Sequence, residues 1–126
     1  MRHMDNDKIK AKILSLDRSK IRFVILFGSA AKGTDGPLSD TDIAVYYEGN
    51  PKERFTFRIK VLGHLPDKVD LHIFQDLPLA VQNEVIKGKV LYYDNYQFVF
   101  DEFMKVIKSF SSFEKYYNEY FAAMEA

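Results

Sequence analysis

Two aspartates that stand two positions apart, Asp40 and Asp42, are the residues of this chain best suited to bind a cation. They lie at the start of an apolar run, Ile43–Tyr47, that is typical of a β-strand. Side chains two apart on a strand point to the same face, so the two carboxylates project together. Converging carboxylates repel each other, and oxygen ligands of this kind suit Mg²⁺. The pair therefore predicts a metal site.

A Gly-Ser pair, Gly28–Ser29, comes before these aspartates and directly after a second apolar run, Ile21–Phe27. Ten residues separate Ser29 from Asp40. Glycine lets the backbone approach a ligand closely, and a helix beginning at Ser29 would offer N–H donors to phosphate groups. We therefore predict a phosphate-binding turn beside the metal site. The alternative is that Gly28 only makes a turn and the aspartates only line a solvated loop.

The composition narrows the class of protein. The chain has 126 residues, of which 47% are hydrophobic, and this predicts a single domain (residues 1–126) with a proper core. Lys and Arg balance Asp and Glu at 18 each, so charge gives no argument for direct nucleic-acid binding. The sequence has no Cys, no signal-peptide pattern and no apolar run of the roughly 18–20 residues that span a membrane. We expect a cytoplasmic protein without membrane association.

Hydrophobic spacing and turn residues give the order of the elements. Helices are expected over Asp5–Leu16, Ser29–Lys32, Lys52–Leu62 and Pro78–Lys87, and strands over Ile21–Phe27, Thr41–Tyr47, Lys68–Phe74 and Val90–Tyr93. In the third helix, Phe55, Ile59 and Leu62 mark the expected inward face. Strands that alternate with helices predict an α/β or α+β fold. We expect a sheet of about four strands flanked by helices over residues 5–93, with a helical extension over residues 95–126.

The extension is expected to be helical over Asn95–Met124, with an interruption at Ser109–Ser112. Most aromatic side chains between Tyr92 and Phe121 are expected to pack in the core or between helices. Four aromatic residues near its end spread over roughly 140° of helix surface, which is wide for a small domain to bury. We therefore expect part of this face to be exposed and to bind a partner. The four residues are Tyr116, Tyr117, Tyr120 and Phe121.

A third carboxylate, Asp70, lies inside the expected strand Lys68–Phe74, where an acid needs a partner. Alternation along this strand puts His72 on the same side as Asp70. His72 either touches a substrate or is a satisfied strand histidine. Asp70 either joins the metal site or faces solvent on a one-sided sheet.

These motifs resemble those of the nucleotidyltransferase superfamily, whose fold is shared with DNA polymerase beta: G-S-x10-D-x-D between two strands. The fuller form, G-S-A-A-K-G followed by S-D-T-D-I, is similar to the small stand-alone MNT-type nucleotidyltransferases, which usually have G-S-x-A-R-G and then S-D-x-D. The matching residues are Gly28, Ser29, Ala31, Gly33, Ser39, Asp40, Asp42 and Ile43. Lys32 stands where that family usually has Arg, which keeps the positive charge but loses the bidentate fork.

The resemblance implies a polymerase beta-like fold and a metal-dependent transfer of AMP from ATP to a hydroxyl group. Asp40, Asp42 and Asp70 would bind two Mg²⁺ ions, and Asp70 would also be the candidate base for the attacking hydroxyl. The residues that would contact the nucleoside triphosphate are Gly28, Ser29, Lys32 and Ser39.

MNT-type proteins are commonly the antitoxins of two-gene pairs with a HEPN-domain ribonuclease toxin, and they transfer AMP to a tyrosine of that toxin. The resemblance therefore implies a HEPN-type toxin as the partner, and the small size and neutral charge favour this over a tRNA or polymerase role. Two alternatives stay open: an antitoxin that acts by contact alone, and a small-molecule nucleotidyltransferase of the antibiotic-modifying kind. A homo-oligomer is also compatible with the sequence.

Overall fold

A four-stranded mixed sheet forms the centre of the computed structural model, which describes residues 5–28 and 41–125. The strands are β1 (Ile21–Phe27), β2 (Thr41–Tyr47), β3 (Val69–Ile73) and β4 (Lys89–Tyr93), in the spatial order β3-β2-β1-β4. β1 pairs antiparallel with β2 and β4, whereas β2 and β3 run parallel. The predicted fold class is confirmed, and β1 and β2 have the predicted bounds.

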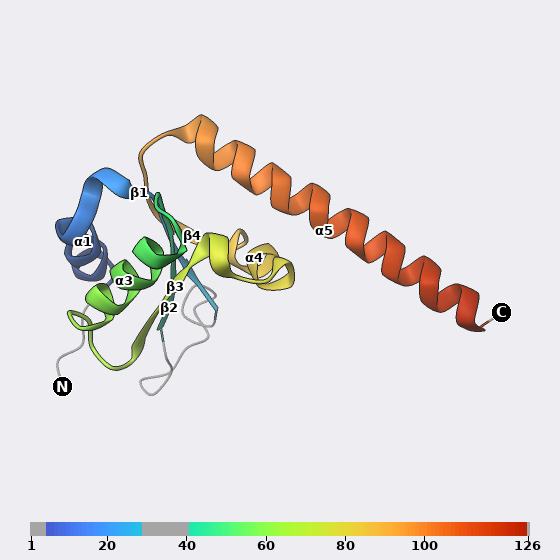
Figure 1. Ribbon diagram of the computed structural model, residues 1–126, viewed down its shortest axis with the longest axis horizontal. Helices are drawn as coiled ribbons and strands as arrows, with labels where there is room; N and C mark the ends of the chain where they lie inside the picture. The colour runs from blue at the N-terminus through green and yellow to red at the C-terminus, as the bar shows by residue number, and fades with distance from the viewer. Residues whose placement is uncertain (1–4, 29–40, 126) are drawn as a thin grey trace.

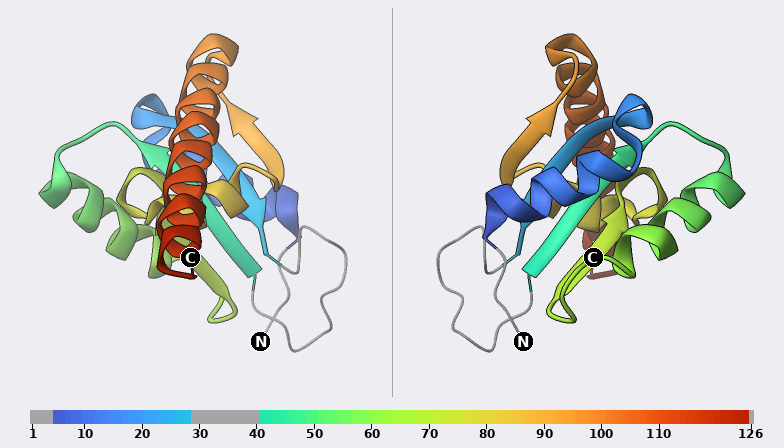
Figure 2. Two further views of the ribbon diagram at one scale, coloured as in Figure 1. Left: turned by 90° about the vertical axis from the view of Figure 1, so that its right-hand side faces the viewer. Right: turned by 90° about the vertical axis from the view of Figure 1, so that its left-hand side faces the viewer.

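Helices cover both faces of the sheet: α1 and α3 lie on one face, and α4 and α5 lie on the other (Figures 1 and 2). Their bounds are Asn6–Asp17 for α1, Pro51–Leu62 for α3, Leu79–Val85 for α4 and Tyr96–Glu125 for α5. Short 3₁₀ turns follow α1 and β3, over Arg18–Lys20 and Phe74–Asp76. Each observed bound is within two residues of the predicted one. The helix expected from Ser29 lies outside the described residues.

Local sequence signals explain where the helices begin. Asp5 caps α1 by accepting a hydrogen bond from the Lys8 backbone N–H at 2.8 Å. Asn50 and Glu53 form a capping box at the start of α3, since each side chain accepts a hydrogen bond from the other residue's backbone N–H, both at 2.9 Å. Such caps satisfy backbone donors that the first turn of a helix leaves free.

The core has two layers because β1 is buried on both faces. Val24 and Leu26 pack toward α1 and α3, and Phe23 and Ile25 pack toward α4 and α5. All four side chains are 2% exposed or less. A strand covered on both faces needs apolar residues along most of its length, which is why β1 is apolar in the sequence at every position except Arg22.

The buried face of α3 differs from the predicted one. Phe57 and Val61 are buried, whereas Phe55 and Ile59 are 63% and 50% exposed. The prediction that Phe55 and Ile59 point inward is therefore wrong, and only Leu62 of that set packs against the core.

Two tertiary contacts select this face of α3. The ring of Phe57 stacks on that of Tyr47, with centroids 4.1 Å apart and planes 14° apart. Beside Phe57, Arg54 forms an ion pair with Asp76 and donates to the Gly49 carbonyl oxygen. Arginine stems cover apolar surface while their charged ends find partners, so they make the buried face of α3 look polar in the sequence.

α5 is one uninterrupted helix over Tyr96–Glu125, so the predicted interruption at Ser109–Ser112 is wrong. Serine lowers helix propensity only modestly, and the helical apolar spacing continues on both sides of it. The prediction that most aromatic residues of this region pack in the core is also wrong. The partial exposure expected near the end of the helix is confirmed. The exposed aromatic residues are Tyr93, Tyr96, Phe100, Phe113, Tyr116, Tyr117, Tyr120 and Phe121.

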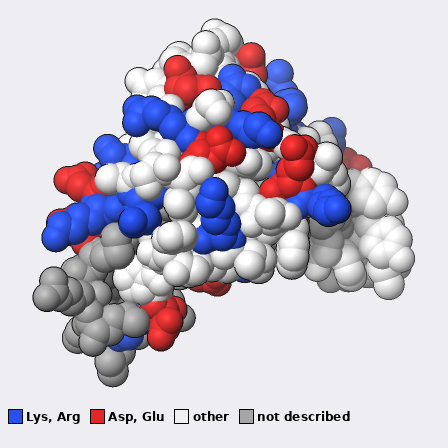
Figure 3. All heavy atoms as spheres, turned by 60° about the vertical axis from the view of Figure 1, so that its left-hand side comes forward, with Lys and Arg blue, Asp and Glu red and all other residues white. Residues whose placement is uncertain are grey.

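Acidic and basic side chains are interspersed on the face seen in Figure 3. Within the described part of the chain, no helix combines the length and the apolar character that crossing a membrane requires.

Candidate active site

The carboxylates of Asp42 and Asp70 lie next to each other where β2 and β3 begin. Asp70 of β3 is directly opposite Asp42 of β2 in their parallel register. The two strands can run parallel because α3 makes the long connection between them. Residues paired in this way point to the same face of the sheet, so the register brings together two acids that are far apart in the sequence. Both side chains are partly open to solvent.

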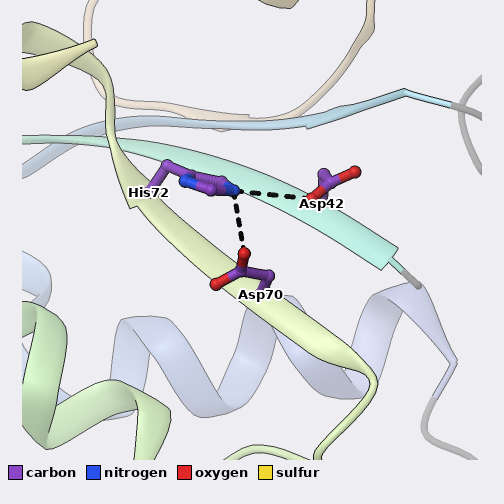
Figure 4. A group of neighbouring side chains, drawn as sticks. All are labelled: Asp42, Asp70 and His72. Carbon is purple, nitrogen blue, oxygen red and sulfur yellow. Dashed lines mark hydrogen bonds and ion pairs between the residues drawn. The ribbon is translucent and has the colours of Figure 1, made fainter.

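His72 joins these two carboxylates (Figure 4). Its Nε2 atom lies 3.4 Å from Oδ1 of Asp42 and 3.3 Å from Oδ2 of Asp70. One ligand atom from each of the three residues lies within 4.8 Å of the others. The alternation of residues in β3 predicts His72 beside Asp70 but leaves the role of His72 open. Its contact with Asp42 depends on the β2–β3 register, which the sequence does not reveal.

Gly28 lies against the same aspartate. It follows β1 with a φ angle of 80°, a conformation that residues with a side chain rarely adopt. A Cβ atom at this position would stand 3.0 Å from Oδ2 of Asp42. The antiparallel pairing of Phe27 with Asp42 sets this closeness. Gly28 therefore turns the chain where both its backbone conformation and its neighbouring carboxylate favour glycine.

One residue of this region, Arg58 of α3, is not among the residues that the sequence predicts for the site. Its Nε donates a hydrogen bond of 2.7 Å to the carbonyl oxygen of Leu71, and its Nη2 lies 3.7 Å from Oδ1 of Asp70. β3 is an edge strand of the described sheet, so its outer backbone groups need partners from outside the sheet. Arg58 thus hydrogen-bonds the outer edge of β3 and forms an ion pair with Asp70. The only signal in the sequence is an arginine on the helix that precedes β3.

Four of the predicted site residues lie outside the described residues, and their roles stay predictions: Ser29, Lys32, Ser39 and Asp40.

The described donors fit the divalent cation that the sequence predicts. Asp42 and Asp70 offer hard oxygen ligands from two strands, and their partial exposure lets an ion reach them from solvent. The two carboxylates also face the same side of the sheet, where a shared cation would offset their mutual repulsion. The site therefore combines a glycine turn with paired acids, which is an arrangement suited to binding phosphates and a metal together.

Comparison with known proteins places the chain in a family. The model of the polymerase beta nucleotidyltransferase family matches residues 8–97. A relative from Methanocaldococcus jannaschii is 31% identical to this chain over 101 residues, which cover 80% of this chain and 73% of that protein. The name of that relative describes it, by inference, as a protein adenylyltransferase. The chain therefore belongs to the polymerase beta nucleotidyltransferase family, a family of nucleotidyl-transferring enzymes.

Solved structures share the fold. A chain in a crystal structure of a toxin–antitoxin with AMP-PNP matches with a TM-score of 0.75 and 23% identity, over 97% of this chain and 100% of that chain. A chain in the structure of the tri-AMPylated HEPN toxin of Shewanella oneidensis in complex with its MNT antitoxin matches with a TM-score of 0.65 and 22% identity, over 94% of this chain and 97% of that chain. The fold is thus that of proteins found in toxin–antitoxin structures.

Proposed function

We propose that this chain transfers AMP from ATP to a hydroxyl group of a partner protein, with a tyrosine of a HEPN-family toxin as the acceptor. The observation that carries the proposal is the meeting of Gly28, Asp42 and Asp70 at one end of the sheet, in a chain of this family. The name of the Methanocaldococcus relative supports adenylyl transfer to a protein. The structures with AMP-PNP and with the AMPylated HEPN toxin support the donor and the acceptor.

The turn at Gly28 receives the triphosphate. Its backbone can approach a phosphate closely because no side chain intervenes, and Ser29 follows it as a further donor. In this proposal Lys32 contributes positive charge for the outer phosphates, and Ser39, which precedes Asp40 in the sequence, contributes a hydroxyl group.

Asp40, Asp42 and Asp70 are the residues that hold the divalent cations, two Mg²⁺ ions in this proposal. When bound, such ions stabilise the charge that develops on the attacking and leaving oxygens. Asp42 and Asp70 offer the cations carboxylate oxygens from two neighbouring strands on one face of the sheet.

In the transfer step, the hydroxyl oxygen of the acceptor forms a bond to the α-phosphorus of ATP, and the bond from that phosphorus to the departing pyrophosphate breaks. A carboxylate oxygen of Asp70 accepts the proton of the hydroxyl group. Arg58 lies 3.7 Å from the carboxylate of Asp70 and fixes the strand that carries it by donating a hydrogen bond to the carbonyl oxygen of Leu71.

The partner surface in this proposal is the exposed aromatic face of the last part of α5. Tyr116, Tyr117 and Tyr120 are 70%, 51% and 54% exposed, and aromatic side chains of this kind are enriched at protein interfaces. Docking there would leave the sheet end with Asp42 and Asp70 free to reach the acceptor tyrosine. An antitoxin acting by contact alone would use the same face, and a small-molecule enzyme would not need it.

The decisive experiment combines the chain with the product of the adjacent gene, ATP and Mg²⁺, and measures the intact mass of that product. We expect a gain of one AMP unit or more. Asp70→Asn should slow the gain by roughly 100-fold or more, since the hydroxyl loses its proton acceptor. Asp67→Asn is the matched control. It removes the same charge as Asp70→Asn, but Asp67 is exposed in the connection just before β3.

The outcomes separate the alternatives. A tight complex with no gain of mass would leave only the contact antitoxin. A gain of mass on an aminoglycoside, with none on the protein, would favour the small-molecule enzyme. Equal rates for Asp70→Asn and Asp67→Asn would remove Asp70 from the mechanism.

A further inference from the structure

We propose that His72 is a direct ligand of the catalytic cation, so that the site is a mixed carboxylate–imidazole site that favours Mn²⁺ over Mg²⁺. This inference rests on the proposed function, because it assumes that Asp42 and Asp70 bind the cation. It adds a nitrogen ligand to a site that sequence analysis built from carboxylate oxygens alone.

The positions of the donor atoms carry the proposal. Nε2 of His72 lies 3.4 Å from an oxygen of Asp42 and 3.3 Å from an oxygen of Asp70. Bonds from a metal ion to its ligand atoms are about 2.1 Å long. Two adjacent ligand atoms are then about 3.0 Å apart if the two bonds form a right angle, and about 3.4 Å apart if they form the tetrahedral angle. The imidazole nitrogen is therefore already at the spacing of a third ligand to the same ion.

The surroundings of the three side chains hold them in this arrangement. The ring of Phe27 lies against the imidazole of His72, with centroids 5.7 Å apart. Asp42 turns Oδ1 toward His72, while its Oδ2 lies beside Gly28. Asp70 turns Oδ2 toward His72, while its Oδ1 lies beside Arg58. Each aspartate thus presents one oxygen to the imidazole nitrogen and has the other beside a separate neighbour.

The types of ligand atom decide which metal ion the site prefers. Mg²⁺ takes oxygen ligands almost exclusively, whereas imidazole nitrogen suits first-row transition metals. Mn²⁺ accepts carboxylate oxygens as readily as Mg²⁺ does and binds nitrogen better. A site with two carboxylates and one imidazole therefore gains affinity for Mn²⁺ that a purely carboxylate site lacks.

The test uses the whole chain with Mn²⁺ alone as the probe and records electron spin echo modulation. A coordinated imidazole nitrogen gives ¹⁴N modulation, and we expect it in the natural protein. The same protein labelled with ¹⁵N-histidine should show the altered coupling, and this measurement does not depend on any variant folding. His72→Gln should abolish the nitrogen modulation, whereas His64→Gln, at an exposed histidine after α3, should keep it.

Competition titrations complete the test. The ratio of Mn²⁺ affinity to Mg²⁺ affinity should fall by about tenfold in His72→Gln and stay unchanged in His64→Gln. Mn²⁺ bound by the carboxylates without nitrogen modulation would overturn the role of His72 and leave the proposed function standing. No binding of Mn²⁺, or binding that survives Asp42→Asn with Asp70→Asn, would overturn both.

Discussion

The two halves of α5 carry the same apolar spacing and meet different surroundings. In the first half, Val99 and Val106 are 9% and 5% exposed, because they pack on the layer formed by β1, α4 and the turn after β3. In the second half, Phe113 and Met124 continue the same alternation of three- and four-residue steps and are 54% and 65% exposed. Figure 1 shows the reason: the helix runs away from the sheet at an angle, so its second half no longer lies against the other elements.

This difference shows what a periodic pattern can and cannot say. The spacing establishes that α5 has one apolar face along its 30 residues. At 1.5 Å per residue a helix of that length spans about 45 Å, and α5 draws away from the sheet along this length (Figure 1). The part that the sheet cannot reach must be covered by another protein or stay in water. The first half of α5 therefore contributes to stability, and the second half is the partner surface of the proposed function.

Placing a charge in each half should give the largest contrast. Val106→Asp buries an unpaired carboxylate and should lower the free energy of unfolding by roughly 3–5 kcal/mol. Phe113→Asp places the same charge on the exposed continuation of the stripe and should change it by less than about 0.5 kcal/mol. Urea unfolding followed by circular dichroism measures both. Similar losses for the two variants would contradict the division of the helix.

Removing aromatic rings from the second half should next affect partner binding. Tyr116→Ala with Tyr120→Ala should weaken capture of the adjacent-gene product by roughly 10- to 100-fold, since such rings are common hot spots of interfaces. Binding of a non-hydrolysable triphosphate should not change. Phe55→Ala with Ile59→Ala on α3 is the control, because these side chains are equally exposed on a different helix. If only the control pair weakened capture, the partner surface would lie on α3.

A smaller effect should come from the contact that holds the start of α5. The guanidinium of Arg22 lies over the ring of Phe98 at 3.6 Å, and Glu48 and Asp94 keep Arg22 in place at 2.7 and 2.8 Å. Phe98→Leu should lower the free energy of unfolding by about 1 kcal/mol, because it removes the cation–π contact while keeping apolar bulk. Phe100→Leu, at an exposed ring, should have no measurable effect. Thermal unfolding of the two variants side by side decides between them.

The smallest expected effect on stability comes from a substitution near the middle of α5, where its two halves meet. Ser111→Ala should raise the stability of the second half by roughly 0.3–0.5 kcal/mol, because alanine has the higher helix propensity at an exposed position. Amide hydrogen exchange over residues 110–125 should slow slightly, with no change over residues 96–106. Unchanged exchange over residues 110–125 would contradict a stabilising effect of the substitution.

Much of the fold follows from short-range features of the sequence. Asp5, Asn50 and Glu53 begin their helices, and runs of apolar residues mark most of β1 and β2, because capping, turn preference and side-chain period act over a few residues. The same local reasoning put Asp70 and His72 on one face of β3. The Gly-Ser and Asp-x-Asp spacing was enough to indicate the family, which the comparisons confirm.

The tertiary structure determined which residues of these elements contact one another. The parallel register of β2 and β3 brought Asp42 to Asp70 and His72, and a shift of one residue would have turned these side chains to opposite faces. The stacking of Tyr47 on Phe57 chose the buried face of α3, against the period of Phe55 and Ile59. These outcomes depend on strand register and on how the helices pack against the sheet. Such contacts join residues far apart in the chain, so no local pattern in the sequence contains them.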